Sequence, residues 1–370
     1  MRAQAKLLVL KLIKENQLDD IMVQVEQMKF RLTYIFLKLF SKNRILTSIY
    51  YLFSSEFKRE QYSVINGKMV HFGDILNKRN NDYLLRRNIH RIEKGLLMRP
   101  RKDVFAARFI NETMNSFDYL LDKNDSSISN TQLKWANDVL KEYFRVVGSH
   151  PSIDKEKKRY NELKIKNKIN NSNKFIPYKR NLEKQMVITL EQLKELSIIR
   201  RSVRWFEDKP VPRQAIDYAI EIGLQAPSAC NRQPFRYQIF DDPELVKKIA
   251  KIPSGTAGFY HNIPTLVAVI GDLTAYPFER DRHLIYIDSS LSIMPFLYGL
   301  EVQGLSSCPL NWPDIEKKEK ELEKIIRTKK YERVIMFIAV GYPDEDAKVA
   351  FSRKKDIDEF RTFNLNVDEV

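Results

Sequence analysis

Apolar residues recur at helical spacing over a long stretch in the first half of the chain. Between residues 81 and 150 they form two stripes, one containing Phe109 and Phe117 and the other containing Leu140. Stripes with this period mark the buried faces of amphipathic helices. The pattern therefore predicts a small helical unit, which we place at residues 61–153.

A different pattern begins further along the chain. Thr189 and Gln192 have the spacing of a capping box, which predicts that a helix starts there. Pro212 is expected to open the next helix, with Ile216 and Leu224 on its buried side. Strands are then predicted at 235–240, 265–270 and 333–340, and a long helix at 284–303. Alternating helices and strands imply a layered core.

Residues 1–60 are both apolar and basic. Their longest apolar stretches, 32–40 and 45–53, are interrupted or bounded by Lys and Arg and are shorter than the roughly 20 residues that cross a bilayer. The mixture suits an amphipathic segment lying at a membrane surface, and a buried face for a partner helix explains it equally well. Both interpretations stay open for residues 29–58.

The composition adds a basic charge and a connector. Residues 154–188 are rich in Lys, Arg and Asn and are predicted to be a solvated connector that leads to a C-terminal domain at 189–370. A net charge of +15 favours an acidic partner. Because no zinc-finger spacing or RNA-binding motif accompanies it, nucleic acid is not expected as a partner. The start lacks the pattern of a secretory signal, so we expect a cytoplasmic protein, with contact at the inner face of the membrane as the alternative.

Few residues offer chemistry of their own. The two cysteines, Cys230 and Cys308, do not suggest a disulfide framework, and the five histidines show no zinc spacing, so no metal site is predicted. The chain also has no Walker loop, no Gly-x-Gly-x-x-Gly fingerprint and no Gly-x-Ser-x-Gly elbow. A redox activity would therefore need a bound cofactor.

Three arginines surround a serine where one predicted helix ends: Arg200, Arg201, Ser202 and Arg204. A guanidinium group is always charged and binds phosphate in a two-pronged geometry, so this cluster is a candidate site for a phosphorylated cofactor. The alternative is a solvated basic surface, which a charge run alone favours.

A second motif, at residues 226–235, combines a bend with hydroxyl and amide groups. It contains Pro227, Ser228, Asn231 and Gln233 directly before a predicted strand. These groups are suited either to hydrogen-bonding the edge of a planar ring or to capping the preceding helix.

The order and spacing of these two motifs resemble the FMN-dependent nitroreductase superfamily. Three later segments also fit: Asn262-Ile263-Pro264, the stretch from Gly304 to Asn311, and Val340 to Pro343 followed by Ser352-Arg353-Lys354. Five ordered matches are far more specific than one. The resemblance implies an α+β fold, a three-layer α-β-α sandwich with a mixed, mostly antiparallel sheet, here with an N-terminal helical extension.

The resemblance also implies a homodimer with FMN at the subunit interface. The residues that it assigns to FMN are Arg200, Arg201, Ser202, Arg204, Pro227, Ser228, Asn231, Gln233, Ser306, Ser307, Cys308 and Arg353. Among these the arginines at 200–204 and Ser202 would serve the phosphate, the ribityl chain and the ring edge, and Arg353 would close on the phosphate. Ser228 and Asn231 would reach the flavin from the partner subunit, and residues 306–308 would line the ring near its reactive nitrogen. No protein side chain is assigned as catalytic, because the chemistry would be centred on the flavin.

The implied activity is that of an FMN-dependent oxidoreductase with a ping-pong mechanism. NAD(P)H would bind transiently and give a hydride to the flavin, and an electrophilic small molecule such as a nitroaromatic, a quinone or an enone would then take the electrons. The alternative is a protein that keeps the fold as a scaffold with little turnover, docked through its N-terminal half to a membrane or to a polysaccharide-assembly partner.

One departure separates the chain from the dehalogenating branch of this superfamily, which it also resembles around residues 309–311. Where that branch has a threonine hydroxyl, this chain has Cys308, a weaker hydrogen-bond donor to the flavin. The difference favours hydride chemistry over dehalogenation.

Residues 86–96 resemble a segment that precedes the nitroreductase-like domain in a bacterial subgroup associated with polysaccharide biosynthesis. Within it, His90 and Glu93 stand three residues apart on a predicted helix. They are suited to metal ligation, to acid–base work or to a surface ion pair. Gly95 is expected to end the helix as a C-cap.

Overall fold

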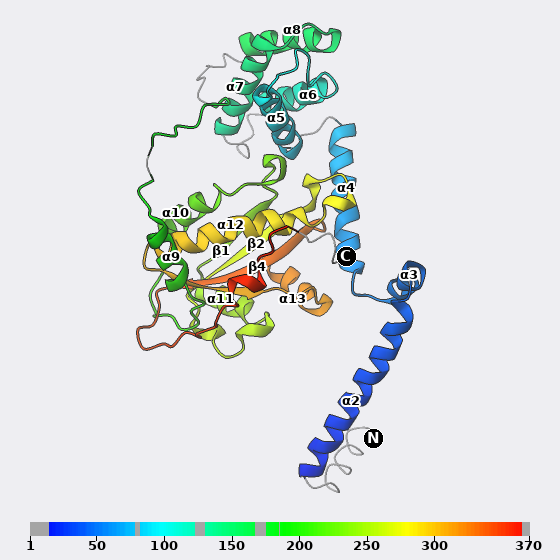
Figure 1. Cartoon of the computed structure of the whole chain (residues 1–370), viewed down its shortest axis with the longest axis vertical. Coiled ribbons are helices and arrows are strands. Elements are labelled where there is room, and N and C mark those ends of the chain that lie inside the picture. The colour runs from blue at the N-terminus through cyan, green and yellow to red at the C-terminus, as the bar shows by residue number, and fades with distance from the viewer. Residues whose placement is uncertain (1–14, 78–81, 123–129, 167–174, 185, 365–370) are drawn as a thin grey trace. The chain divides into compact units, whose positions relative to one another are not determined.

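The computed structural model describes residues 15–77, 82–122, 130–166, 175–184 and 186–364, which form two compact parts, Met1–Gln61 and Tyr62–Val370. The first part contains helix α2 (Glu15–Phe40) and helix α3 (Arg44–Phe53), and helix α4 (Lys58–Leu76) begins at its end. Figure 1 shows these helices in blue.

The turn between α2 and α3 is fixed by polar contacts. The Asn43 side chain accepts a hydrogen bond from the backbone N–H of Leu46 at 3.0 Å and caps α3. The Thr47 hydroxyl donates to the Phe40 carbonyl at 2.9 Å. The two helices also share ring contacts, since the centroids of Phe40 and Tyr50 lie 5.7 Å apart.

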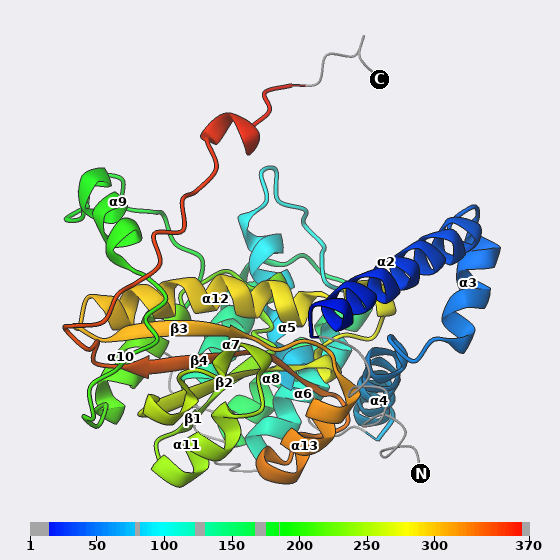
Figure 2. The ribbon, with the colours of Figure 1, turned by 90° about the horizontal axis from the view of Figure 1, so that it is seen from below.

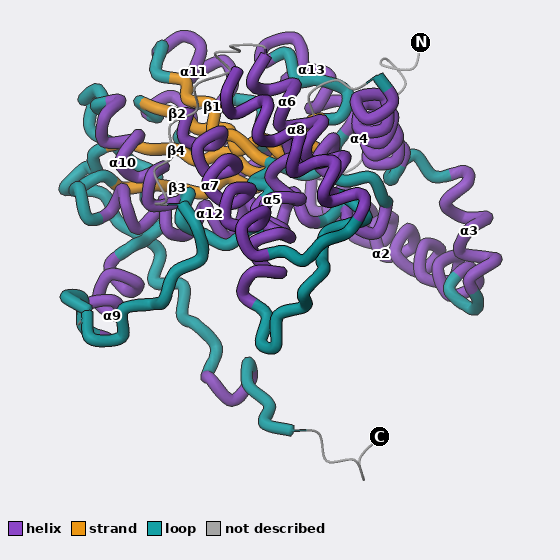
Figure 3. Tube along the Cα trace, turned by 90° about the horizontal axis from the view of Figure 1, so that it is seen from above, coloured by secondary structure: helices purple, strands orange, loops and turns teal. Residues whose placement is uncertain are grey.

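The second part begins with an all-helical region, drawn entirely as helix and loop in Figure 3. Its helices are α5 (Asp82–Leu97), α6 (Ile110–Asp122), α7 (Asn130–Val146) and α8 (Pro151–Lys166). They share one buried core, in which Leu85 and Ile92 of α5 meet Phe117 of α6 and Leu140 of α7. The helical period read from the sequence is therefore confirmed, because its apolar stripes are the buried faces.

One antiparallel sheet forms the centre of the remaining domain. Its strands are β1 (Phe235–Phe240), β2 (Thr265–Asp272), β3 (Ser306–Asn311) and β4 (Glu332–Gly341), in the order β1-β2-β4-β3. A parallel bridge between Ser202 and Ser307 adds a short extended segment beside β3. The sheet is thus mixed but mostly antiparallel, as predicted.

Helices cover both faces of this sheet, as Figure 2 shows. One face carries α10 (Arg213–Gly223) and α12 (Leu284–Glu301), and the other carries α11 (Pro243–Ala250) and α13 (Glu316–Ile326). Strand β2 is buried on both sides, with Val267 facing the first helical layer and Leu266 facing the second. The α+β three-layer fold is confirmed.

Shorter elements connect these layers. Helix α9 (Leu190–Ile199) precedes α10, and its predicted capping box between Thr189 and Gln192 is present. The 3-10 helices are η1 (Ala229–Asn231), η2 (Ser254–Thr256), η3 (Tyr260–Asn262), η4 (Leu273–Ala275), η5 (Glu279–Asp281) and η6 (Ile357–Glu359).

Helix α4 ties the helical extension to the sheet domain. The side chain of His71 is buried, and its Nδ1 atom lies 2.7 Å from the carbonyl oxygen of Thr274. At Gly67 any added Cβ would lie 2.8 Å from Leu273, so the two elements pack too closely for a side chain. Residues 62–76 therefore dock onto η4 at one end of the sheet.

Several expectations are wrong in detail. Helix α5 continues past Gly95, which is not a C-cap; its missing side chain makes room for Phe105, whose ring would lie 2.3 Å from an added Cβ. Leu224 is 43% exposed rather than buried. The first part of the predicted connector forms α8, because Ile153 and Tyr160 are buried in the helical core. Strand β3 and helices α11 and α13 were not predicted. The domain boundaries otherwise stay a prediction.

Candidate functional site

The arginine segment runs beside the first residues of β3. Helix α9 ends at Arg200, and the chain then extends so that Ser202 bridges Ser307 and the Val203 N–H donates to the Ser307 carbonyl at 3.0 Å. Pairing with β3 fixes the backbone positions of Arg200, Ser202 and Arg204. We call Arg200, Arg201, Ser202, Arg204 and Ser307 the arginine cradle.

Two residues outside the predicted site hold this segment in place. Asn262 accepts the backbone N–H of Phe206 at 2.9 Å and donates to the Arg204 carbonyl at 3.2 Å. Gly341, at the end of β4, lies against the Phe206 ring, which would be 2.8 Å from an added Cβ. The segment is therefore clamped between the start of β2 and the end of β4.

The cradle contains polar atoms that no protein group satisfies. Arg200 Nε and the Ser307 hydroxyl are both buried and lack a hydrogen-bond partner in the part of the chain that the structure describes. The Arg201 guanidinium donates to the Phe351 carbonyl at 3.2 Å, and exposed Arg204 donates to the Ser202 carbonyl at 3.3 Å. Buried polar groups are rarely left unpaired, because desolvation costs about 1–3 kcal/mol for each. The set fits an anionic, hydroxyl-rich group such as the phosphate and ribityl chain of FMN.

Glu301 lies close enough to Arg200 for the charge of Arg200 to affect its pKa. Burial raises the pKa of the Glu301 carboxyl, and the charge of Arg200 opposes that rise. One oxygen of Glu301 is buried without a hydrogen-bond partner among the residues that the structure describes. The positive charge of the cradle is thus only partly balanced by the protein.

Cys308 follows the cradle on β3 and is 2% exposed. Burial raises the pKa of its thiol, while the nearby Arg204 charge and a hydrogen bond with Ser202 oppose the rise. The thiol therefore stays protonated near neutral pH and acts as a weak donor instead of a nucleophile.

Arg353 is not brought to the cradle. Its side chain is 76% exposed, and its ion pair is with Asp356 at 3.6 Å. All residues from 348 to 364 are exposed, and in Figure 2 the chain leaves the domain there. Among the described residues, this segment is linked to the cradle through the Phe351 carbonyl, which accepts a hydrogen bond from Arg201.

The second motif forms a bend anchored on α12. The Ser228 hydroxyl donates to Asp288 Oδ2 at 2.7 Å, and the Ala229 N–H donates to the same oxygen at 3.0 Å. The Gln233 N–H returns to the Ser228 hydroxyl at 2.8 Å. We call residues 227–233 the anchored loop. The Ser228 side chain therefore holds the loop in place through its hydrogen bonds. Exposed Pro227 is the first residue of the loop.

The anchored loop stores backbone strain. Cys230, Asn231 and Gln233 have φ of 53°, 52° and 54° without being glycine. Each such residue costs on the order of 1 kcal/mol or more and persists only where its surroundings impose it. Strain of this kind gathers at ligand sites, which agrees with the predicted role of Asn231 and Gln233.

Helix α5 holds the other side of the anchored loop. The Arg86 guanidinium donates from Nε to the Asn231 carbonyl at 2.9 Å and from Nη1 to the Gln132 side-chain oxygen of α7 at 3.3 Å. Next to it, Arg232 is 7% exposed and stacks over the Tyr276 ring at 4.7 Å. The helical extension is therefore part of the frame of this loop.

The cradle and the anchored loop lie at opposite ends of the sheet. Ser306 pairs with Gly341 at the end of β4, whereas Phe235, just after the loop, pairs with Gly271, which pairs with Arg333 at the start of β4. At about 3.3 Å per residue, the eight steps from Arg333 to Gly341 span about 26 Å. One chain cannot bring both predicted halves to the same flavin.

His90 and Glu93 form an ion-pair arrangement on α5. His90 Nδ1 lies 3.6 Å from Glu93 Oε2, and the Trp135 ring N–H donates to Glu93 Oε1 at 2.9 Å. Within the described ranges, no group of three His, Cys, Asp or Glu residues could hold a metal ion. The contacts favour the ion-pair interpretation over the others.

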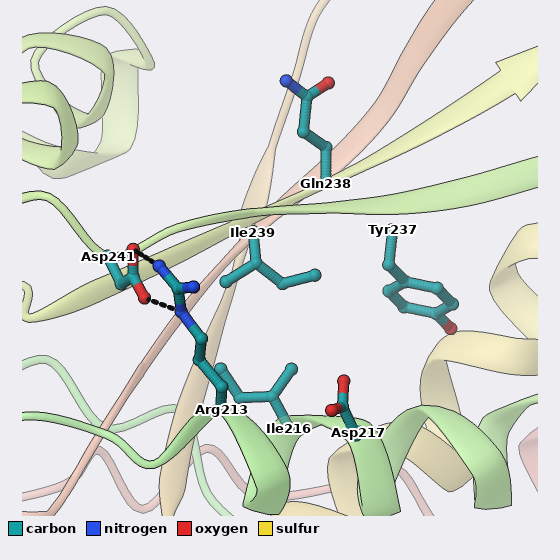
Figure 4. A pocket seen from close by; sticks show the side chains of 7 residues that line it. All are labelled: Arg213, Ile216, Asp217, Tyr237, Gln238, Ile239 and Asp241. Atoms are coloured by element: carbon teal, nitrogen blue, oxygen red, sulfur yellow. Dashed lines mark hydrogen bonds and ion pairs between the residues drawn. The ribbon is translucent and has the colours of Figure 1, made fainter.

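A pocket of about 450 Å³ lies between α10 and β1 (Figure 4). Arg213 and Asp241 pair across it in two hydrogen bonds of 2.6 and 3.1 Å. None of the predicted site residues lines it. Because its main charges neutralise each other, it is not the predicted cofactor site.

Sequence reasoning missed Asp288, Asn262 and Arg86, which hold the two parts of the site. Asp288 gives one signal, since it is an acid inside a mostly apolar helix. Asn262 and Arg86 were noticed only as members of longer motifs. Their roles depend on contacts with residues 56 and 145 positions away, which no local pattern reveals.

Comparison with known proteins places the likeness in the C-terminal domain. A model of the Nitroreductase family matches residues 199–257 and 253–342. Iodotyrosine deiodinase of Thermotoga neapolitana is 27% identical over 47% of this chain and all of its own length, and human iodotyrosine deiodinase 1 is 24% identical over 50% of this chain and 73% of its own. A protein of Archaeoglobus fulgidus whose name includes NAD(P)H nitroreductase is 24% identical over 42% of this chain and 88% of its own.

Solved structures resemble somewhat less than half of the chain. The FMN-dependent nitroreductase of Clostridium difficile R20291 is 21% identical, covering 46% of this chain and 97% of its own, with a TM-score of 0.38. A nitroreductase family protein of Streptococcus pneumoniae is 21% identical over 46% and 100%, with a TM-score of 0.40. The family match supports the nitroreductase superfamily for residues 199–342, and residues 1–198 lie outside it.

Proposed function

We propose that the domain matching the Nitroreductase family is an FMN-dependent oxidoreductase that takes hydride from NAD(P)H and reduces an electrophilic small molecule. The observation that carries the proposal is the arginine cradle, where Arg200 Nε and the Ser307 hydroxyl are buried without partners inside the matched segment. When bound, FMN would supply the hydride transfer in two half-reactions. The protein residues bind and orient it.

Each residue of the cradle then has a defined role. Arg200 and Arg201 would neutralise the phosphate, Ser202 and Ser307 would bind hydroxyl or ring oxygens, and Arg204 would place a positive charge near the ring edge. Arg353 would complete the phosphate site only after its segment moves from the exposed position that it has here.

The separation of the two halves supports a homodimer. Because the anchored loop lies about 26 Å from the cradle along β4, its Ser228, Asn231 and Gln233 would serve a flavin held by the cradle of the partner subunit. Two equivalent sites would result. A second copy of this chain is thus the expected partner, besides the small-molecule acceptor.

Nitroaromatics, quinones and enones are the acceptor classes that we propose. A second candidate is reductive dehalogenation, which the names of the first two relatives favour. Cys308 opposes it, since its buried, protonated thiol is a weaker hydrogen-bond donor than the threonine hydroxyl of the dehalogenating branch.

The test is to purify the protein, add FMN and record the visible flavin absorbance. Stopped-flow mixing of the NAD(P)H-reduced protein with nitroaromatics, quinones, enones and halophenols then ranks the acceptors by reoxidation rate. Protein that stays colourless with added FMN would contradict the proposal and favour the scaffold alternative. Cys308→Thr should raise the rate with halophenols relative to quinones; an unchanged ratio would count against the role given to the thiol.

A further inference from the structure

Helices α2 and α3 carry a large apolar surface. The exposed fractions of Leu32, Ile35 and Phe36 on α2 are 62%, 64% and 53%, and those of Leu52 and Phe53 on α3 are 71% and 80%. No residue of α3 is buried. Surfaces of this extent on a soluble protein usually mark a place where something binds.

One face of α2 is apolar along its whole length. Residues spaced three, four or seven apart lie on the same side of a helix, and one such stripe consists of Ile21, Val25, Met28, Leu32, Ile35, Phe36 and Leu39. A narrower stripe beside it is polar and contains Gln24, Gln27, Arg31 and Lys38, whereas the remaining side again exposes apolar residues, Val23, Phe30, Tyr34 and Leu37. Helix α2 is therefore apolar over most of its circumference and carries one polar stripe, and at about 1.5 Å per residue its apolar surface extends over several nanometres.

The α2–α3 hairpin is basic in its second half, whereas Glu15, Asp19, Asp20 and Glu26 lie in its first half. The second half, from Gln27 to Ser55, contains five cations and no Asp or Glu, and the cations are Lys29, Arg31, Lys38, Lys42 and Arg44. A second copy packed on this segment would bring two sets of unbalanced cations together. Nucleic acid would attract the cations but leave the apolar stripe in water. An anionic lipid bilayer satisfies both surfaces.

The α2–α3 hairpin has a defined structure before it binds a partner. The rings of Phe36 and Phe40 lie 4.6 Å apart, and both contact the ring of Tyr50, at 6.3 and 5.7 Å. Together with the Asn43 cap, these contacts fix α3 beside the end of α2. Little ordering would be needed at a surface, and aromatic rings suit the headgroup level.

We propose that the α2–α3 hairpin lies, through residues 27–53, on the surface of an anionic phospholipid bilayer, with its apolar stripe at the acyl boundary and its basic residues among the headgroups. No helix in the described ranges is long and apolar enough to cross a membrane. The hairpin lies in the plane of the interface instead. This docking is independent of the oxidoreductase proposal, because it needs no flavin.

The test compares the full chain with two variants of equal charge. Leu32→Glu places a carboxylate in the apolar stripe, and Gln27→Glu places the same charge on the polar stripe. Each is mixed with vesicles of phosphatidylcholine alone and of phosphatidylcholine with phosphatidylglycerol, and the bound fraction is measured by sedimentation. Far-ultraviolet circular dichroism confirms that both variants keep their helices.

The wild type should bind the phosphatidylglycerol vesicles and not the neutral ones, and added salt should weaken the binding. Leu32→Glu should reduce binding by at least about tenfold and Gln27→Glu by much less. Equal losses in both variants, or no binding by the wild type, would overturn the proposal. The proposal would also be overturned if the wild type did not bind vesicles and Leu32→Glu dissociated an oligomer detected by analytical ultracentrifugation.

Discussion

The arginine cradle and the anchored loop are held by different kinds of interaction. The cradle is an extension of the sheet: Ser202 bridges Ser307, and Asn262 and Gly341 clamp the segment that follows. The anchored loop has no strand neighbour of this kind and is held by two side chains, Asp288 and Arg86, from helices far away in the sequence. We infer that backbone pairing gives the cradle a position that single substitutions hardly move, whereas the loop depends on individual side chains.

The largest effect is expected in the cradle, on ligand binding instead of folding. Arg200→Ala removes a charge-assisted contact and should weaken FMN binding by about 1.5–3 kcal/mol, with little change in stability because the backbone pairing remains. The measurement is a fluorescence titration with FMN. Arg213→Ala is the matched control, since its exposed guanidinium pairs with Asp241 away from the cradle. Equal losses in the two variants would refute the cradle assignment.

In the loop, the effect should fall on stability. Asp288→Asn replaces the carboxylate oxygen that accepts from both Ser228 and Ala229, and we expect a loss of about 1–3 kcal/mol in the free energy of unfolding. Urea denaturation measures the loss. Asp217→Asn, on the neighbouring helix α10, controls for a change of charge. A variant as stable as the wild type would show that the loop does not need its anchor.

A smaller effect is expected on the other side of the loop. Arg86→Gln removes the bond to the Asn231 carbonyl and should cost about 1 kcal/mol. The strained backbone at Cys230 and Asn231 should then relax, and amide hydrogen exchange of residues 228–233 should speed up while that of residues 200–204 does not. Faster exchange in both segments would mean that the two regions are not held separately.

The smallest effect concerns pH at the same end of the sheet. Burial lowers the pKa of His71 below its ordinary value of 6.5, and the charges of Arg87 and Arg232 lower it further, against the Thr274 carbonyl and Glu112. The folded state therefore binds the proton less well than the unfolded state, so stability should fall as pH drops below that value. His71→Gln should reduce the change in the urea midpoint between about pH 7.5 and about pH 5.5. An unchanged slope would remove His71 as the cause.

The difference between backbone pairing and contacts from distant side chains also decides how much of the fold could be predicted from the sequence. Strand β1 was predicted at its observed bounds and the capping box of α9 is present, because both depend on neighbours along the chain. Helix α8 was missed, since its many Lys and Arg side chains conceal a sparse buried face at Ile153 and Tyr160. Gly95 was misassigned because only the contact with Phe105 explains it.

For the site, the residue types were visible but their grouping was not. The cradle could be named from its arginines, whereas the positions of Asp288 and Arg86 beside the loop follow from tertiary packing. The exposed position of Arg353 also lies beyond any local pattern, since nothing in its own segment reports which part of the fold it contacts.

The distance between cradle and loop has a genetic consequence. If each flavin takes its cradle from one subunit and its loop from the other, a mixed dimer of an Arg200→Ala chain and an Asp288→Asn chain contains one site with both defects and one site with neither. Where each variant alone has low activity, producing the two together would then restore activity, and the restored fraction would follow the proportion of mixed dimers. Defects of this kind would complement one another between alleles although they affect a single gene product.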